Sequence, residues 1–226
     1  MWVKVCGNKR LEDCQRAVEL GVDALGFIFA HGKRLVTAEH VQGITSQLPS
    51  SVATYGVFTQ NDPDLIANTV SAAGIYGVQL HGTFDPVLAA ALRARFPKAE
   101  TPRLLQVVPW DVDALAVEQQ QWLSRQLAVL ADSGLVDAVL IDSRTQQGSG
   151  GTGTTFDWEA AAPVLQNAML PVLVAGGLRP ENVGDAVRAL QPWGVDVSSG
   201  VERAPGIKDA ARMTLFVHHA RSRAVV

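Results

Sequence analysis

The sequence of 226 residues has only two cysteines and a nearly balanced charge. Cys6 and Cys14 are too few for a disulfide framework, so a reducing compartment is expected, and a special cysteine there is expected to be catalytic rather than cross-linked. Lys+Arg number 19 and Asp+Glu number 22, which gives a net charge of −3. No broad positive field would therefore attract nucleic acid or an anionic membrane as the main partner.

Long apolar runs are also missing. Short runs such as residues 139–141 fall far below the roughly 20 residues that a membrane-spanning helix needs. Residues 1–4 carry neither the basic stretch nor the apolar core of a signal peptide. With 47% hydrophobic and 18% charged residues, the chain is too apolar to be disordered. We therefore expect a globular, cytoplasmic protein without a nucleic-acid or membrane partner.

Several chemical signatures are absent as well. No spacing of His, Cys, Asp and Glu is typical of a metal site, no GxSxG or Walker pattern occurs, and no GxGxxG follows the first predicted strand. The sequence therefore predicts neither a metal nor a cofactor.

What the sequence does contain is a regular alternation of β-rich and amphipathic runs. Strands are expected at 2–6, 23–29, 52–58, 75–80, 103–108, 137–142, 171–175 and 194–198. Helices are expected at 11–20, 38–47, 63–73, 85–95, 112–132, 157–167, 180–190 and 209–221. The short joints between them imply parallel strands with right-handed crossovers. Eight such units fit a single-domain (β/α)8 TIM barrel over residues 1–226, and an open doubly wound sheet is the alternative.

Helix boundaries have local support. Thr37, Asp62 and Asp85 are side-chain caps at three helix entries, and Gly74 follows a helix where a left-handed residue is favourable. Residues 97–135 are polar and rich in glutamine, which leaves open an irregular excursion in this region.

Glycine clusters follow the last three predicted strands. Backbone N–H groups without side chains can surround an anion, and barrels often bind phosphate at the loops after strands seven and eight, beside a small extra helix. Residues 200–209 are long enough to hold such a helix. The clusters expected to bind phosphate are residues 148–153, which include Thr152 and Gly153, then Gly176-Gly177, and then Ser198-Ser199-Gly200. Glycines that only make tight turns are the alternative interpretation.

Cys6 and Asp142 end the first and sixth strands, on opposed parts of the predicted barrel rim. A Cys6 thiolate could remove a carbon-bound proton, and Lys4 faces the same side of its strand. A buried Asp142 with a raised pKa could transfer a proton too, so the pair suits proton transfer without a metal. The alternatives are a small buried hydrophobe for Cys6 and a loop cap for Asp142. Cys14, inside the first helix, is expected to be structural.

Three more polar residues fall near the rim. Arg34 either grips a substrate carboxylate through two bonds or is a solvated charge. His81 either titrates near neutrality or holds a backbone carbonyl. Asp196 either pairs with Lys4 inside the closed barrel, where an unpaired charge is costly, or reaches a substrate hydroxyl.

Seven groups of residues occur in order along nearly the whole chain: KVCGNKR, DALGFIF with GKRLVT, YGVF, GVQLHG, GGTGTTFDW, VLVAGGLRPENV, and VDVSSGVE with PGIKD. On these motifs the chain resembles the phosphoribosylanthranilate isomerase family of tryptophan biosynthesis. The resemblance implies a (β/α)8 barrel that rearranges N-(5-phosphoribosyl)anthranilate, an aminoaldose, to the 1-deoxyribulose 5-phosphate aminoketose. This Amadori rearrangement needs no metal or cofactor.

The resemblance also implies roles for individual residues. Cys6 corresponds to the family's general base and Asp142 to its general acid, while Arg34 corresponds to the arginine that holds the anthranilate carboxylate. The complete set of expected substrate-binding residues is Gly7, Arg34, His81, Thr152, Gly153, Gly176, Gly177, Asp196, Ser198, Ser199 and Gly200. The expected partner is a phosphorylated small molecule, and the chain is expected to be a monomer or a homodimer.

Two other functions stay open on the sequence. The aminoimidazole-carboxamide ribotide isomerase of histidine biosynthesis runs the same rearrangement, but would have an aspartate in place of Cys6. A non-catalytic barrel that binds a phosphate ligand would not require both Cys6 and Asp142. The chain departs from the family pattern at Lys9, in the LLQVVPW stretch of the fifth strand and in the expanded residues 97–135.

Overall fold

The computed structural model describes residues 1–145, 148–149 and 155–222, and within these ranges the strands form a closed parallel barrel. The barrel strands are β1 (Trp2–Val5), β2 (Ala24–Ile28), β3 (Ala53–Phe58), β4 (Gly77–Leu80), β5 (Leu104–Asp111), β6 (Ala138–Thr145), β8 (Val172–Val174) and β9 (Gly194–Val197). Each pairs with the next, β6 pairs with β8, and β9 returns to β1. The predicted (β/α)8 barrel is confirmed, and the open doubly wound sheet is wrong.

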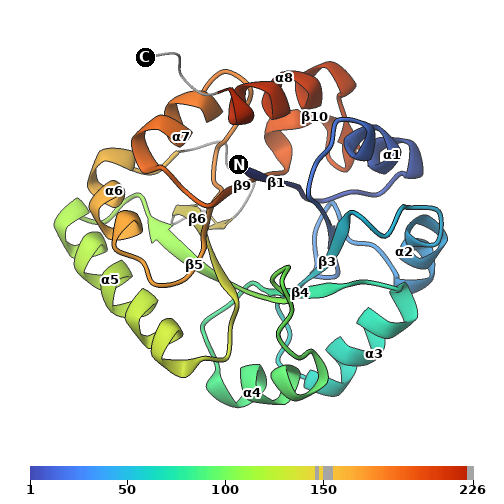
Figure 1. Ribbon diagram of the computed structural model, residues 1–226, viewed down its shortest axis with the longest axis horizontal. Helices are drawn as coiled ribbons and strands as arrows, with labels where there is room; N and C mark the ends of the chain where they lie inside the picture. The colour runs from blue at the N-terminus through green and yellow to red at the C-terminus, as the bar shows by residue number, and fades with distance from the viewer. Residues whose placement is uncertain (146–147, 150–154, 223–226) are drawn as a thin grey trace.

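Helices form the outer ring. They are α1 (Leu11–Glu19), α2 (Ala38–Thr45), α3 (Pro63–Ala73), α4 (Pro86–Arg95), α5 (Ala116–Ser133), α6 (Trp158–Gln166), α7 (Val183–Leu190) and α8 (Ala210–Arg221). They follow one another around the strands in chain order, so that α8 returns to the side of α1 (Figure 1). Among the described residues, no helix is long and apolar enough to span a membrane.

The predicted caps are present at the helix entries. The Thr37 side chain accepts a hydrogen bond from the His40 N–H at 3.2 Å, and Asp62 accepts one from the Asp64 N–H at 2.9 Å. Asp85 caps α4 in the same way. Gly74 ends α3 with φ 61°, in the left-handed region. Local sequence therefore determines these boundaries.

The helix expected at 112–132 is present as α5, whereas the segment after β9 differs from expectation. Residues 97–135 contain no irregular excursion in place of the helix: β5 extends to Asp111, and α5 is a regular helix of 18 residues. In the segment after β9, a short 3-10 helix, η1 (Ser199–Val201), leads into an antiparallel hairpin of β10 (Glu202–Ala204) and β11 (Ile207–Lys208). The small helix expected within residues 200–209 is thus mostly a hairpin.

Side chains inside the barrel change character along its axis. An apolar cluster fills the lower part, and its buried members are Ala24, Tyr55, Leu105, Val107, Ala138, Leu140, Leu173 and Ala175. Closer to the carboxyl ends of the strands the inward positions become polar, beginning with Lys4 on β1 and Asp196 on β9. This apolar cluster excludes water from the amino-terminal end of the barrel, so the polar groups above it lie in surroundings of low polarity.

The Lys4–Asp196 ion pair joins the first and last barrel strands. The two residues are register partners, and Lys4 Nζ donates to Asp196 Oδ1 at 2.9 Å. The Lys4 side chain is fully buried and that of Asp196 is 9% exposed. The structure confirms the internal pairing, the first of the two interpretations of Asp196.

Removing one partner of this pair should be strongly destabilising. We predict that Lys4→Met or Asp196→Asn lowers the free energy of unfolding by about 3–5 kcal/mol, because the remaining charge stays buried without compensation. Denaturant unfolding of both single variants and of Lys4→Met/Asp196→Val measures the coupling. The double variant should lose much less than the sum of the two singles, and strict additivity would contradict the prediction.

Candidate functional site

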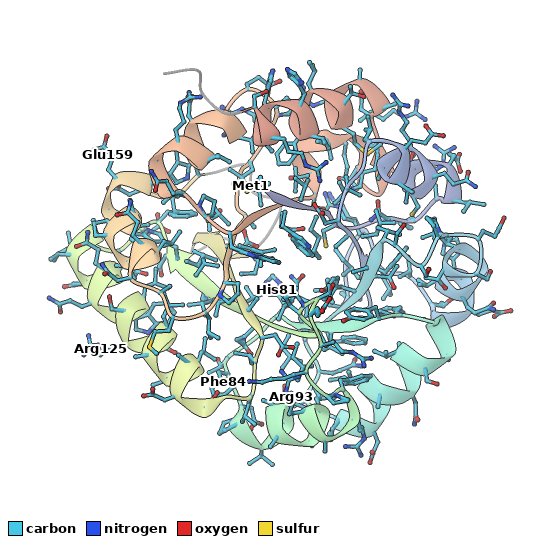
Figure 2. All side chains as sticks on the ribbon, in the orientation of Figure 1. Met1, His81, Phe84, Arg93, Arg125 and Glu159 are labelled. Atoms are coloured by element: carbon cyan, nitrogen blue, oxygen red, sulfur yellow. The ribbon has the colours of Figure 1, made fainter. Side chains whose placement is uncertain are left out.

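A cavity of about 350 Å³ opens at the carboxyl ends of the barrel strands. Its lining includes ten residues that the sequence predicts for the site: Cys6, Arg34, His81, Asp142, Gly176, Gly177, Asp196, Ser198, Ser199 and Gly200. In Figure 2, His81 lies near the centre of the ring, whereas Arg125 and Glu159 lie on its outer edge. Thr152 and Gly153 lie outside the described residues. The side chains predicted from five different strand ends therefore converge on one cavity.

Gly7 is not among the residues that line the cavity, although it was expected to bind substrate. It has φ +73°, and an added Cβ would lie 2.6 Å from Arg34 Cδ and 2.8 Å from Ser198 Oγ. A side chain at this position would be strained and would displace both neighbours. Gly7 thus allows Arg34 to cross close to the end of β1.

The Cys6 thiol lies on the inner face of the barrel, 5% exposed. Burial raises the pKa of Cys6 above its ordinary value, and the nearby Lys4 ammonium offsets only part of this effect. Asp196 acts in the opposite direction from Lys4 and adds to the rise. The resting group at neutral pH is therefore the neutral thiol, with a cation beside it that favours the thiolate when a proton has to move.

The Asp142 carboxyl is the second titratable group of the cavity. Burial raises its pKa to about 7, and the Asp196 carboxylate contributes in the same direction. The Ser143 backbone N–H and Lys4 oppose this shift. A carboxyl with a pKa near 7 exists in both protonation states at neutral pH, which suits a proton donor.

His81 directly follows β4 and lines the same cavity. Burial, followed by the positive charge of Lys4, lowers the pKa of its imidazole below the ordinary value. The imidazole is therefore neutral at pH 7, and the interpretation that it titrates near neutrality loses support. Within the described ranges no hydrogen bond joins it to a backbone carbonyl either, and its part in substrate binding stays a prediction.

Arg34 is already paired, which the sequence analysis missed. Its Nε lies 2.9 Å from Glu202 Oε1, and its Nη2 lies 2.6 Å from Glu202 Oε2. Glu202 thus occupies one edge of the guanidinium, and the predicted two-bond grip on a substrate carboxylate cannot use that edge while the pair is intact. The solvated-charge alternative is wrong.

Lys208 completes this network. Its fully buried ammonium donates to Glu202 Oε1 at 2.9 Å, to the Ser198 carbonyl at 3.2 Å and to the Cys6 carbonyl. One lysine on β11 therefore ties the ends of β1 and β9 to the carboxylate that holds Arg34. Glu202 and Lys208 stand in the VDVSSGVE and PGIKD motifs, but the sequence gives no sign that they pair with Arg34.

The Glu202 carboxylate should orient Arg34 rather than only stabilise the fold. We predict that Glu202→Gln raises KM for a carboxylate-bearing substrate roughly 10-fold or more, because the charge-assisted bonds that fix the guanidinium are lost. Steady-state kinetics of the folded variant measures this effect. Glu181→Gln, which removes an exposed partner of Arg212, is the matched control and should leave KM unchanged. An unaltered KM in Glu202→Gln would contradict the prediction.

The turns after β8 and β9 pack tightly against each other and against β6. An added Cβ at Gly176 would lie 2.5 Å from the Ser143 backbone nitrogen, and one at Gly200 would lie 1.9 Å from the Leu178 carbonyl oxygen. Gly176 and Gly177 both have positive φ, of 80° and 63°. The tight-turn interpretation therefore holds at these glycines, and it is compatible with a phosphate site because the same turns line the cavity.

Gly200 offers a direct test of these turns. We predict that Gly200→Ala destabilises the protein by about 1–3 kcal/mol and raises KM for a phosphorylated substrate about 10- to 100-fold, because the turn after β9 must move away from Leu178. Gly43→Ala is the control, since a Cβ at Gly43 in α2 would meet nothing within 4 Å. It should be neutral or stabilising. Equal effects of the two substitutions would contradict the prediction.

Other parts of the described chain show fewer features of a functional site. A groove of about 830 Å³ lies between α5 and α6 on the outer side of the ring, and its lining contains no strand-end residue. Cys14 is fully buried in α1, and burial raises its pKa to about 12, which fits a structural role. Within the described residues, no group of three or more His, Cys, Asp or Glu residues could hold a metal ion.

Several known proteins match this chain in both sequence and fold. Residues 3–219 match the family model for N-(5'-phosphoribosyl)anthranilate (PRA) isomerase. The enzyme of that name from Myxococcus xanthus is 41% identical over 221 residues, covering 97% of this chain and 96% of that protein. The Geobacter sulfurreducens enzyme is 38% identical over 220 residues, covering 97% and 98%. The crystal structure of the Thermotoga maritima enzyme superposes with a TM-score of 0.83 at 32% identity and covers 98% of both chains.

Proposed function

Because this chain belongs to the N-(5'-phosphoribosyl)anthranilate isomerase family, we propose that Cys6 and Asp142 are the general base and general acid of its reaction. The protein is an isomerase of tryptophan biosynthesis that converts N-(5-phosphoribosyl)anthranilate to 1-(2-carboxyphenylamino)-1-deoxyribulose 5-phosphate. The observation that carries the proposal is that the two side chains line one cavity and that the pKa of Asp142 is about 7.

The first step opens the sugar ring. Protonated Asp142 gives its proton to the furanose ring oxygen as the bond between that oxygen and C1 breaks. The nitrogen lone pair forms the new C1–N double bond, which leaves a protonated Schiff base. A carboxyl group with a pKa near 7 supports this role, because a proton donor works best when its pKa is near the working pH.

The second step moves the proton from C2. The cationic imine makes the C2–H bond acidic, the Cys6 thiolate removes this proton, and the bonding electrons form the C1–C2 double bond of an enolamine. Protonation of C1 and loss of the hydroxyl proton at C2 then give the ketone. The adjacent Lys4 ammonium supports the thiolate form of Cys6.

The form of the enzyme that can react has Asp142 protonated and Cys6 ionised. The two pKa values favour the opposite form, in which Asp142 has lost its proton and Cys6 has kept its own. The pKa of Cys6 lies above its ordinary value, whereas that of Asp142 is about 7. The competent form carries one proton for the pair, so its population is largest between the two pKa values. The free-enzyme activity is accordingly expected to rise through about pH 7 and to fall at higher pH, as the second proton leaves.

Binding at both ends of the substrate would hold C1 and C2 between the two side chains. The turns at Gly177 and Gly200 line the cavity on the side of β8 and β9, where the phosphate is proposed to bind. Arg34, on the loop after β2, is proposed to hold the anthranilate carboxylate through guanidinium hydrogens that Glu202 leaves available. Binding of the phosphate and the carboxylate, which do not react, would then align the reacting atoms and so raise the rate of the chemical step.

The remaining predictions concern the state of the protein. The solved structure of a reduced 1-(o-carboxyphenylamino)-1-deoxyribulose 5-phosphate complex has a TM-score of 0.80 to this chain at 30% identity, which supports a phosphorylated small molecule as ligand. Another solved relative is described as monomers of a dimeric enzyme. For this chain, a monomer or homodimer, a cytoplasmic location and the action of residues 1–226 as one domain stay predictions, as do the absence of a cofactor and the part of Thr152 and Gly153.

Substitution of either group should abolish turnover while binding persists. We predict that Cys6→Ser and Asp142→Asn each lower kcat about 10²–10⁴-fold, because each loses one proton-transfer group. Loss of the substrate's anthranilate fluorescence measures turnover, and the affinity for the reduced product analogue should stay within a few-fold of wild type. If Cys6→Ser lost analogue binding together with turnover, Cys6 would be structural instead. Cys14→Ser, in α1, is the matched control and should keep kcat.

A further inference from the structure

Asn182 directly precedes α7, but its side chain does not cap any of the described N–H groups of that helix. Other helices of the ring are capped by the side chain before them, and the capping residues are Thr37, Asp62, Asp85, Asp157 and Asp209. Asparagine is as good a capping residue as serine or aspartate. The Asn182 amide therefore serves another interaction, one that the proposed mechanism does not include.

The amide holds the turn that follows β8. Asn182 Oδ1 accepts a hydrogen bond from the Arg179 N–H at 2.8 Å, and its Nδ2 donates to the Gly177 carbonyl at 3.1 Å. Gly177 and Leu178 line the catalytic cavity, whereas the half-buried Asn182 is not part of that lining. The two bonds therefore reach the turn from its outer side, the side of α7.

The bond to the Gly177 carbonyl determines where the next N–H group points. In a trans peptide group, which is planar, the C=O and the N–H point in opposite directions. The Gly177 carbonyl and the Leu178 N–H belong to one such group. Because Asn182 holds the carbonyl on the side of α7, the N–H is directed to the opposite side of the turn, where the cavity lies. No hydrogen bond from this N–H occurs among the described residues, so it can donate to a ligand.

The turn needs such a hold because of its two glycines. Gly176 and Gly177 have φ values of 80° and 63°. Glycine adopts positive and negative φ with similar ease, so the peptide groups here could rotate at little cost. A rotated group would present a carbonyl oxygen to the cavity, and that oxygen would repel an anion. The Asn182 amide thus selects the orientation in which the turn offers a donor.

We propose that Asn182 is a positioning residue for the phosphate group of the substrate, and this assignment rests on the proposed function. It acts through the main chain of the turn and makes no contact with the ligand. Backbone N–H groups that already point at an anion bind it without the cost of ordering the loop. Loss of the amide should accordingly weaken binding at the phosphate end of the substrate and spare the other end.

The test measures affinity for two fragments of the substrate, inorganic phosphate and anthranilate, by NMR titration. Asn182→Ala should lower the affinity for phosphate about 10-fold, because the turn is no longer held in the orientation that binds the anion. The affinity for anthranilate should stay within about twofold of wild type. In steady-state kinetics KM should rise about 10-fold and kcat should change less, because Cys6 and Asp142 are untouched. Asn182→Ser gives the same readouts if Asn182→Ala does not fold, since its shorter side chain cannot replace both bonds.

Asp62→Ala is the matched control. The Asp62 side chain caps α3 and is not part of the cavity lining. Its loss should lower the midpoint of thermal unfolding by about 2–4 °C and leave both affinities within about twofold of wild type. This variant separates a loss of stability from a loss of phosphate binding.

Three results would overturn the inference. The first is wild-type phosphate affinity in Asn182→Ala, which would limit the residue to shaping the start of α7. The second is an equal loss of phosphate and anthranilate affinity, which would indicate a general loosening of the cavity. The third is an equal loss of phosphate affinity in Asp62→Ala. A wild-type protein that binds phosphate but does not turn over N-(5-phosphoribosyl)anthranilate would instead contradict the proposed function, independently of Asn182.

Discussion

The Lys4 ammonium has no exposed surface and stays charged inside the barrel because the Asp196 carboxylate lies 2.9 Å away. Burial alone would lower its pKa, but Asp196 and the Cys6 thiol outweigh this effect, and the net pKa is raised. This one charge influences the other groups of the cavity, since it lowers the pKa of His81 and opposes the rise at Cys6 and Asp142. The ion pair thus sets the electrostatic conditions under which the site can move protons.

A second network of hydrogen bonds starts from the β10–β11 hairpin and holds residues at the carboxyl ends of the barrel strands in place. Lys208 donates to the Cys6 carbonyl and to Glu202, and Glu202 holds Arg34. The base of the reaction and the proposed carboxylate-binding residue are therefore positioned by the same buried lysine. Gly7 makes this arrangement sterically possible, because any side chain there would collide with Arg34. Catalytic and binding geometry are consequently coupled through β10 and β11.

Much of the fold, and the end of the barrel at which the site lies, could be predicted from the sequence, because both depend on local signals. Alternating β-rich and amphipathic runs, caps such as Asp62 and glycines after strands identified the barrel and its reactive end. The Arg34–Glu202 pair could not be predicted, since 168 positions separate its members and either charge alone is typical of a solvated surface. The regular α5 was uncertain because packing, rather than composition, stabilises its polar sequence.

The account depends on a thiol and a carboxyl group that face the same sugar, the thiol at C2 and the carboxyl at the ring oxygen. A crystal structure of this chain with the reduced product analogue tests it most directly. The account predicts that the sugar lies between Cys6 Sγ and the Asp142 carboxyl, with each within about 3–3.5 Å of the atom it serves, and that the phosphate contacts the backbone at Gly177 and Gly200. An analogue bound with either side chain turned away from C1 and C2, or with its phosphate outside these turns, would contradict it.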